Sequence, residues 1–184
     1  GQCDWQAQAK LTMKNAYLHL TLEQADWNIS PTHFQASSFP EHWRRKISVI
    51  HDGVDTRQAL PNPAPSPLKL PDGTVLEHGQ PIVTFVNRSL EPYRGCHTFI
   101  RAIPELQRLH PEARLVVVGN TEGVSYGAAC PDGEWRDQFL AEIEGQYDPS
   151  RVHFTGTLPY QQFIPLLQLN ACHVYLTYPF VLSW

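Results

Sequence analysis

The pattern of apolar and polar positions changes near residue 80. Beyond it, short uninterrupted apolar runs alternate with segments in which apolar residues recur every three or four positions. Uninterrupted runs of strand length are typical of parallel strands buried on both faces, and the intervening spacing is that of amphipathic helices. The pattern predicts strands at 81–86, 113–119, 151–156 and 172–178. We therefore predict an α/β fold with a doubly wound parallel sheet.

Three helices are predicted between these strands. The first places Phe99, Ile103, Leu106 and Leu109 on one face, and the second covers residues 134–144. Pro159 opens the third, whose apolar residues are Phe163, Leu166 and Leu167. Helices in such positions cover both faces of a parallel sheet.

The part of the chain before residue 80 follows other patterns. Residues 12–25 contain good helix formers, and short strands are predicted around Trp27–Ile29 and Ile47–Ile50. A proline-rich stretch follows, and Pro71-Asp72-Gly73 between two short apolar runs predicts a hairpin at 68–76. We predict three parts, namely residues 1–56, a linker with a hairpin at 57–80, and the α/β part at 81–184.

Ligands of open parallel sheets bind at the carboxyl ends of the strands, so the residues there are the candidate site. These residues are Asn87, Arg88, Ser89, Gly119, Asn120, Thr155, Gly156, Tyr178 and Pro179. A long glycine-rich segment without periodicity, residues 120–133, also follows a strand end. Loops of that kind are often functional or mobile.

Arg88 and Arg94 lie on either side of the first strand–helix connection, which ends in Gly95. Two guanidinium groups beside a helix N-terminus suit a pyrophosphate. The alternative is two surface arginines, one stacked on Tyr93 or paired with Glu91. Gly119 and Gly156 likewise have two interpretations, since each could allow close approach of a ligand or simply form a turn.

Composition and motifs limit the kinds of ligand site that the chain can form. With 42% hydrophobic and 17% charged residues, the 184-residue chain fits a globular domain, and its net charge of -4 means that any anion site must be local. The four cysteines are dispersed, and no GxGxxG, HExxH or Ser-His-Asp arrangement occurs. His33 and His97 could touch a ligand, although isolated histidines more often have structural roles. No apolar stretch is long enough for a membrane span, so we expect a cytoplasmic protein.

Several segments together resemble the donor-binding domain of family 4 glycosyltransferases, retaining enzymes with the GT-B fold. They are "ISVIHDGVDT", "VTFVNRSLEPYRGCHTFIRAIPELQRLHPEARLVVVGN" and "RVHFTGTLPYQQFIPLLQLNACHVYLTYPFVLSW". The resemblance implies that the chain is a fragment, with the end of an acceptor domain followed by an incomplete Rossmann-like half of a GT-B fold.

The resemblance also implies roles for individual residues. Arg88 and Arg94 would bind the donor diphosphate together with backbone N–H groups of the loop that contains Ser183 and Trp184. Gly119, Thr155, Gly156, Pro179 and Phe180 would lie at the donor nucleotide and sugar. One departure is that Phe180 takes the place where the family usually has a glutamate near the donor sugar. Phe180 could pack on the sugar or plug the loop, and no catalytic residue is assigned.

The function implied is transfer of a sugar from a nucleoside diphosphate sugar to an acceptor hydroxyl, with retention and without a metal ion or other cofactor. We expect a hexosyltransferase of bacterial polysaccharide or glycoconjugate biosynthesis, with a glycan, lipid-linked or other hydroxyl acceptor, at the inner face of the membrane. No nucleic-acid partner is expected. A non-catalytic nucleotide-sugar-binding or scaffold module is the alternative, and another GT-B-like enzyme of activated sugars is a further one.

Overall fold

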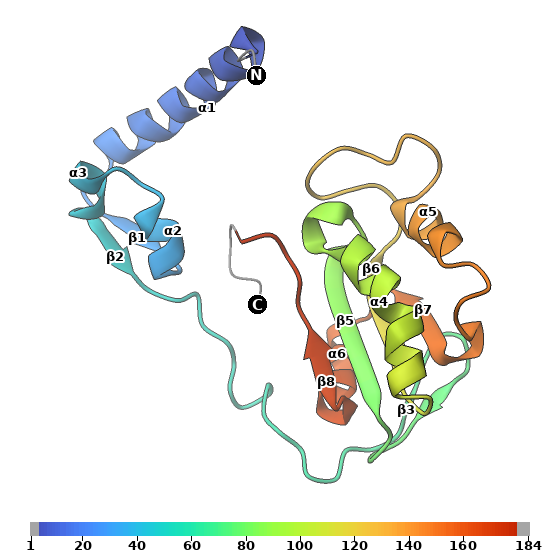
Figure 1. Cartoon of the computed structure of the whole chain (residues 1–184). Coiled ribbons are helices and arrows are strands. Elements are labelled where there is room, and N and C mark those ends of the chain that lie inside the picture. Colours follow the sequence, from blue (N-terminus) through green and yellow to red (C-terminus); the bar gives the residue numbers. More distant parts are fainter. Residues whose placement is uncertain (1–3, 180–184) are drawn as a thin grey trace. The chain divides into compact units, whose positions relative to one another are not determined.

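A computed structural model of the chain describes residues 4–179 (Figure 1). Contacts divide these residues into two compact units, one of residues 4–54 with Pro179 and the other of residues 55–178. Residues 57–80 therefore belong to the second unit, and they include the predicted hairpin.

The first unit is small and mostly helical. Its elements are α1 (Trp5–Gln24), β1 (Asn28–Ser30), α2 (His33–Ser37), α3 (Glu41–Arg44) and β2 (Ile47–Val49). β1 and β2 pair in parallel, and Leu22, Ala36 and Trp43 are its buried apolar side chains. The helix predicted from residue 12 begins earlier, because Asp4 caps it by accepting a hydrogen bond from the backbone N–H of Gln6.

The second unit carries the parallel sheet. Its elements are β3 (Leu68–Lys69), β4 (Val75–Leu76), β5 (Ile82–Ser89), η1 (Pro92–Arg94), α4 (Cys96–Leu109), β6 (Arg114–Asn120), α5 (Trp135–Glu142), η2 (Pro149–Arg151), β7 (Val152–Gly156), α6 (Tyr160–Leu169) and β8 (Cys172–Val174). The strands β5, β6, β7 and β8 form one all-parallel sheet in the order β7-β6-β5-β8. β3 and β4 form the predicted antiparallel hairpin.

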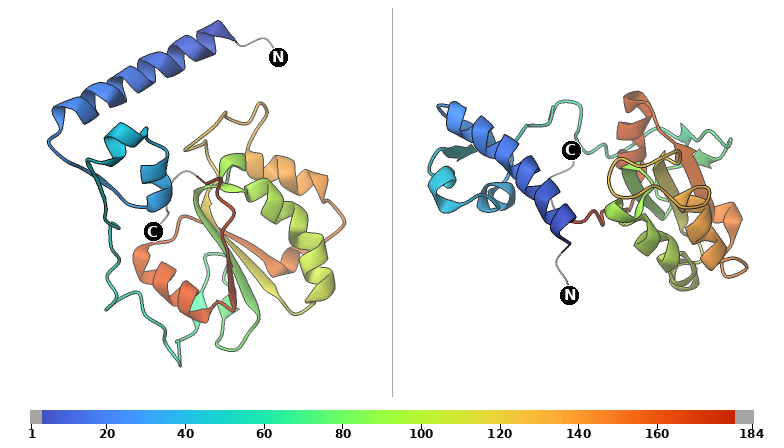
Figure 2. Two further views of the ribbon diagram at one scale, coloured as in Figure 1. Left: turned by 60° about the vertical axis from the view of Figure 1, so that its left-hand side comes forward. Right: turned by 90° about the horizontal axis from the view of Figure 1, so that it is seen from above.

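Both faces of the sheet are covered, as Figure 2 shows. Leu115 and Val117 belong to a core cluster with residues of α4 and α5, such as Phe99 and Phe139. Val116 and Val118, which point to the other face, pack with α6 and the hairpin in a second cluster. Because alternate residues of one strand pack into two different core clusters, residues 115–118 of the strand are all apolar. The predicted doubly wound α/β sheet is confirmed.

Two predicted elements differ in detail. Leu109 was assigned to the apolar face of α4 but is 54% exposed, whereas Ile100 is fully buried. At 3.6 residues per turn, position 109 lies well away from the stripe formed by Cys96, Phe99, Ile100 and Ile103. The last strand was predicted to reach residue 178, but β8 ends at Val174.

The segment after β8 leaves the sheet because it packs on the start of α4. A Cβ atom on Gly95 would lie 2.5 Å from both the Cβ and the carbonyl oxygen of Leu176, so the two segments are in close contact. The backbone N–H of Tyr178 then donates to the carbonyl oxygen of Tyr93 at 3.0 Å. β5, by contrast, runs further than predicted, and Asn87, Arg88 and Ser89 are part of the strand.

Candidate functional site

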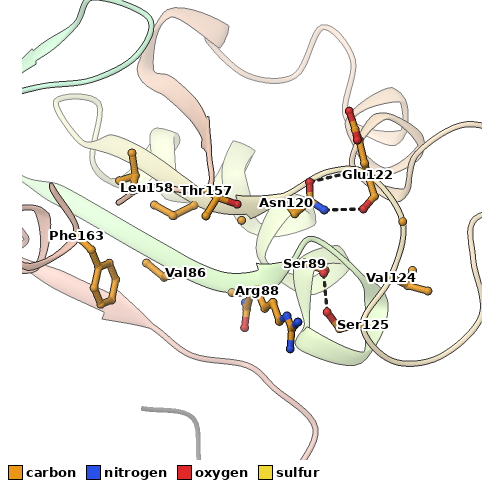
Figure 3. A pocket seen from close by; sticks show the side chains of 14 residues that line it. Val86, Arg88, Ser89, Asn120, Glu122, Val124, Ser125, Thr157, Leu158 and Phe163 are labelled. Carbon is orange, nitrogen blue, oxygen red and sulfur yellow. Dashed lines mark hydrogen bonds between the residues drawn. The ribbon is translucent and has the colours of Figure 1, made fainter. Parts of the chain in front are cut away.

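A cavity of about 660 Å³ lies at the carboxyl ends of β5, β6 and β7 (Figure 3). Its walls are the last residues of β5 and β6, two residues that follow β7, a segment of the β6–α5 connection and Phe163 of α6. The lining residues are Val86, Asn87, Arg88, Ser89, Val118, Gly119, Asn120, Glu122, Gly123, Val124, Ser125, Thr157, Leu158 and Phe163. The volume is in the range of small-molecule sites, and the place is the one predicted for a parallel sheet.

Arg88 is the exposed arginine of this cavity. It lies between Asn87 and Ser89, both buried, near the end of β5. Figure 3 shows its side chain extending alongside Ser89 and Ser125. No carboxylate of residues 4–179 lies within 4.0 Å of its guanidinium nitrogens. A guanidinium that is exposed and not neutralised in this way is suited to binding an anion.

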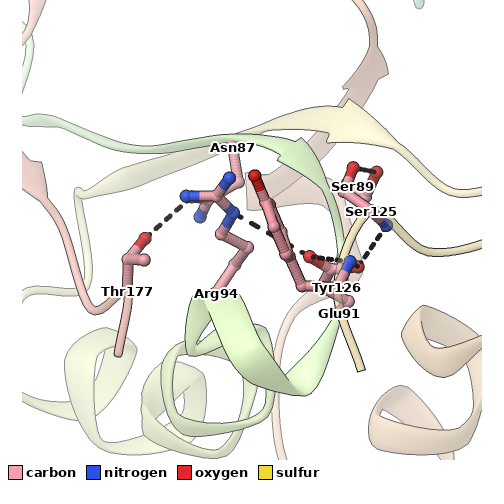
Figure 4. Close-up of polar contacts among 7 residues, drawn as sticks. All are labelled: Asn87, Ser89, Glu91, Arg94, Ser125, Tyr126 and Thr177. Atoms are coloured by element: carbon pink, nitrogen blue, oxygen red, sulfur yellow. Dashed lines mark hydrogen bonds and ion pairs between the residues drawn. The ribbon is translucent and has the colours of Figure 1, made fainter. Parts of the chain in front are cut away.

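Arg94 has a different environment (Figure 4). Its side chain is 8% exposed, and its Nε lies 3.8 Å from Oε1 of Glu91. Its Cζ lies 4.9 Å from the ring centre of Tyr126. The sequence left open that one of the two arginines pairs with Glu91 on the surface. Arg94 does pair with Glu91, but the pair is buried. Arg94 is absent from the described lining of the cavity, so the structure does not bring the two arginines together there.

Asn87 and Thr177 mark a second edge of the site, between the ends of β5 and of the segment after β8. The hydroxyl of Thr177 donates to Oδ1 of Asn87 at 3.4 Å, and both side chains are buried. Figure 4 shows the guanidinium of Arg94 near these two residues. In the order β7-β6-β5-β8, the β5–β8 boundary is where the connections change direction, which is the position favoured for ligands in such sheets.

Glu91 does not line the cavity but contacts Ser125, which does, and the sequence indicates no role for it beyond a pair with an arginine. Its carboxylate is fully buried and accepts hydrogen bonds from the backbone N–H groups of Ser125, at 2.6 Å, and Tyr126, at 3.0 Å. The hydroxyls of Ser89 and Ser125 are 2.7 Å apart. These contacts hold the irregular β6–α5 connection against the end of β5. The only sequence signal was the length and glycine content of that connection.

The two glycines at strand ends have different roles. Gly119 lines the cavity and lies so close to β5 that a Cβ would meet the carbonyl oxygen of Asn87 at 2.6 Å. Gly156 has a φ of +67° with no atom within 4 Å of an added Cβ, so it serves the turn after β7. Thr155 donates to the carbonyl oxygen of Gly156 at 3.0 Å. Thr155 and Gly156 lie beside the cavity lining formed by Thr157 and Leu158.

The remaining predicted residues lie elsewhere. Pro179 is exposed, and Phe180, Ser183 and Trp184 are outside the described residues. His33 is in α2 of the first unit, and the ring of His97 is 5.9 Å from that of Phe139 in the core beneath α4. Phe163, which the sequence assigned to the packed face of a helix, contributes to the cavity wall.

The described residues place an exposed guanidinium in the cavity but form no metal cluster. Within residues 4–179, no three His, Cys, Asp or Glu side chains are grouped so that they could hold a metal ion. The same residues contain no helix of the length and hydropathy needed to cross a membrane. The polar groups that line the cavity therefore include one exposed guanidinium, serine and asparagine side chains, and backbone at strand ends.

Two models of glycosyltransferase families match the chain. The family model described as "Glycosyl transferases group 1" matches residues 69–178, and the one described as "Glycosyl transferase family 4 group" matches residues 2–59. No curated protein matches the chain.

Among solved structures, "Crystal Structure of TarM" matches with a TM-score of 0.56 and 14% identity. The match covers 88% of this chain and 27% of TarM, so the chain spans about a quarter of that protein's length. At this identity the likeness shows a shared fold, and it confirms the predicted Rossmann-like half of a GT-B fold.

Proposed function

The chain belongs to the glycosyl transferases group 1 family, and from this we propose that its cavity binds the nucleoside diphosphate part of an activated sugar. The reaction would move the sugar, a hexose, to an acceptor hydroxyl with retention at the anomeric carbon. A glycan or lipid-linked acceptor at the inner face of a bacterial membrane, in polysaccharide or glycoconjugate synthesis, is part of the same proposal.

The observation that supports this most is Arg88 in the cavity at the strand ends. A diphosphate carries its charge on oxygen atoms that accept several hydrogen bonds, and a guanidinium offers a planar set of donors for them. The hydroxyls of Ser89 and Ser125 hydrogen-bond each other, which leaves one O–H of this pair as a further donor for the ligand. The apolar residues Val86, Leu158 and Phe163 leave room for a less polar part of the ligand.

Arg88 would also serve the reaction itself. When the bond between sugar and diphosphate breaks, negative charge grows on the departing phosphate oxygens. A guanidinium fixed beside that position stabilises the charge in the transition state more than in the ground state. Arg94 would act from the neighbouring β5–β8 edge, where its buried positive charge lies near Asn87 and Thr177. We propose that these cations take the place of a metal ion.

The test is calorimetric titration of the full-length protein with UDP, GDP and ADP, followed by assays of transfer and hydrolysis with the sugar donor of the nucleotide that binds. We expect one nucleotide to bind at micromolar concentration and its sugar to be transferred with equal rate in the presence of EDTA. Binding without any turnover would favour the alternative of a scaffold module. Binding of no nucleoside diphosphate would contradict the proposal.

A further inference from the structure

One wall of the cavity is irregular chain, and a buried carboxylate binds the backbone at its end. Residues 122–125 line the cavity within the connection between β6 and α5. The connection has no regular secondary structure from Thr121 to Glu134. Such a segment has little order of its own, because no helix or strand hydrogen bonds restrict its backbone. Its position at the cavity must come from contacts with other parts of the unit.

Glu91 provides the main polar contacts of this kind. Ser125 donates its backbone N–H to Oε2 at 2.6 Å, and the N–H of Tyr126 is shared between Oε2 at 3.0 Å and Oε1 at 3.2 Å. The glutamate side chain is 0% exposed. A buried carboxylate is costly unless it is hydrogen-bonded and paired, and Glu91 has two backbone donors and Arg94 3.8 Å away. Its placement is thus tied to the conformation of the connection.

The side chain of Tyr126 strengthens the same anchor. Its ring lies under the guanidinium of Arg94 at 4.9 Å and is stacked with the ring of Tyr93 at 6.0 Å between centroids. Figure 4 shows Arg94, Tyr126 and Glu91 packed together with Ser125 and Ser89 next to them. Backbone and side-chain contacts therefore fix two successive residues of the connection, namely Ser125, which lines the cavity, and Tyr126, which follows it.

From this geometry we propose that Glu91 is a positioning residue of the ligand site. It holds residues 122–126 in place before a ligand arrives, so that binding does not have to order this wall. The inference rests on the proposed function, because it takes the cavity of Arg88 to be the nucleoside diphosphate site. Order that already exists in the free protein raises affinity, since the entropy of fixing the segment is lost on folding and not on binding.

The first test uses the unchanged full-length protein without nucleotide and measures hydrogen exchange at single amides. The amides of Ser125 and Tyr126 should exchange much more slowly than those of Gly123 and Gly127, which have no protein acceptor in the described residues. Equal, rapid exchange at all four positions would overturn the inference, whatever the behaviour of any variant.

The second test compares Glu91→Gln, which keeps the shape of the side chain, with Glu105→Gln, an exposed glutamate on α4. Glu91→Gln should speed exchange in residues 121–134 but leave α4 unchanged, and weaken binding of the UDP or GDP that the unchanged protein binds by about 10-fold. For the sugar donor, KM should rise with kcat nearly constant, because a positioning wall contributes equally to ground and transition states. Glu105→Gln should change neither.

The outcomes separate this inference from the proposed function. If the unchanged protein binds UDP or GDP and Glu91→Gln binds it equally well, Glu91 does not position the site and the inference is wrong. If the unchanged protein binds no nucleoside diphosphate, the proposed function fails and the role of Glu91 at a donor site fails with it.

Discussion

A side chain at position 119 has no room beside β5, because a Cβ atom on Gly119 would lie 2.6 Å from the carbonyl oxygen of Asn87 and 2.9 Å from Cδ2 of Leu90. Gly119→Ala must therefore push apart two paired strands at the edge of the cavity. We expect a loss of about 2–4 kcal/mol in the free energy of unfolding, from overpacking and backbone displacement. Urea unfolding measures it.

The control for this prediction is Gly145→Ala. Gly145 has a φ of +71° and no atom within 4 Å of an added Cβ, so its substitution carries only the conformational term of about 1–2 kcal/mol. A Gly119→Ala variant that is no less stable than Gly145→Ala would show that β5 and β6 are not in such close contact.

The regular part of the fold could be predicted from the sequence because each element carries its own signal. The strand through Val116 and Val117 is an uninterrupted apolar run, and the hairpin at Asp72-Gly73 has a turn sequence of its own. β8 was predicted too long, since the residues from Tyr175 on are as apolar as a strand. Their departure from the sheet depends on a contact between Leu176 and Gly95, which no local pattern encodes.

The site could be predicted only in part for the same reason. Arg88 follows from the rule that ligands bind at strand ends, and the structure places it in the cavity. Glu91 could not be found, since its donors at Ser125 and Tyr126 are 34 and 35 residues away along an irregular connection. Arg94 has the same residue type and a similar place in the sequence as Arg88, but its burial depends on Tyr126 and Glu91.

The hairpin should be held to β7 in a pH-dependent manner. Nδ1 of His153, a buried residue, lies 2.7 Å from Oδ2 of Asp72, and the backbone N–H of Thr74 donates to Oδ1 at 2.8 Å. Burial raises the pKa of Asp72, but the hydrogen bonds from Thr74 and His153 outweigh it, and the pKa falls below its usual 3.8. A lowered folded-state pKa stabilises the fold above pH 3.8, and this contribution is lost as pH falls through the folded-state pKa.

Asp72→Asn should therefore lower the free energy of unfolding near pH 7, and the difference from the unchanged protein should shrink below about pH 4. Urea unfolding across this pH range measures both, with Asp132→Asn, an exposed aspartate of the β6–α5 connection, as control. An effect of Asp72→Asn that stays constant down to pH 3 would contradict the role of its charge.

The cysteines in residues 4–179 should react with thiol reagents in a fixed order. Burial raises the pKa of the Cys96 thiol to about 12, and its side chain is in the core beneath α4. Cys172 is exposed and Cys130 is half-buried. Iodoacetamide at pH 8 should label Cys172 first, Cys130 next and Cys96 only when the unit unfolds, because the thiolate is the reactive form. Mass spectrometry of the peptides gives the order, and early labelling of Cys96 would show that its helix is not packed as described.

The account depends most on Arg88, and the dissociation constant of its alanine variant tests it most directly. Titration of full-length Arg88→Ala with UDP or GDP should show binding weakened by about 10- to 100-fold, since a charge-assisted hydrogen bond is worth about 1.5–3 kcal/mol. Arg88→Lys should keep part of the affinity, because it retains the charge without the planar donors. Arg108→Ala, which removes an exposed arginine from α4, should bind as the unchanged protein does. An unchanged dissociation constant for Arg88→Ala would contradict a diphosphate site in this cavity.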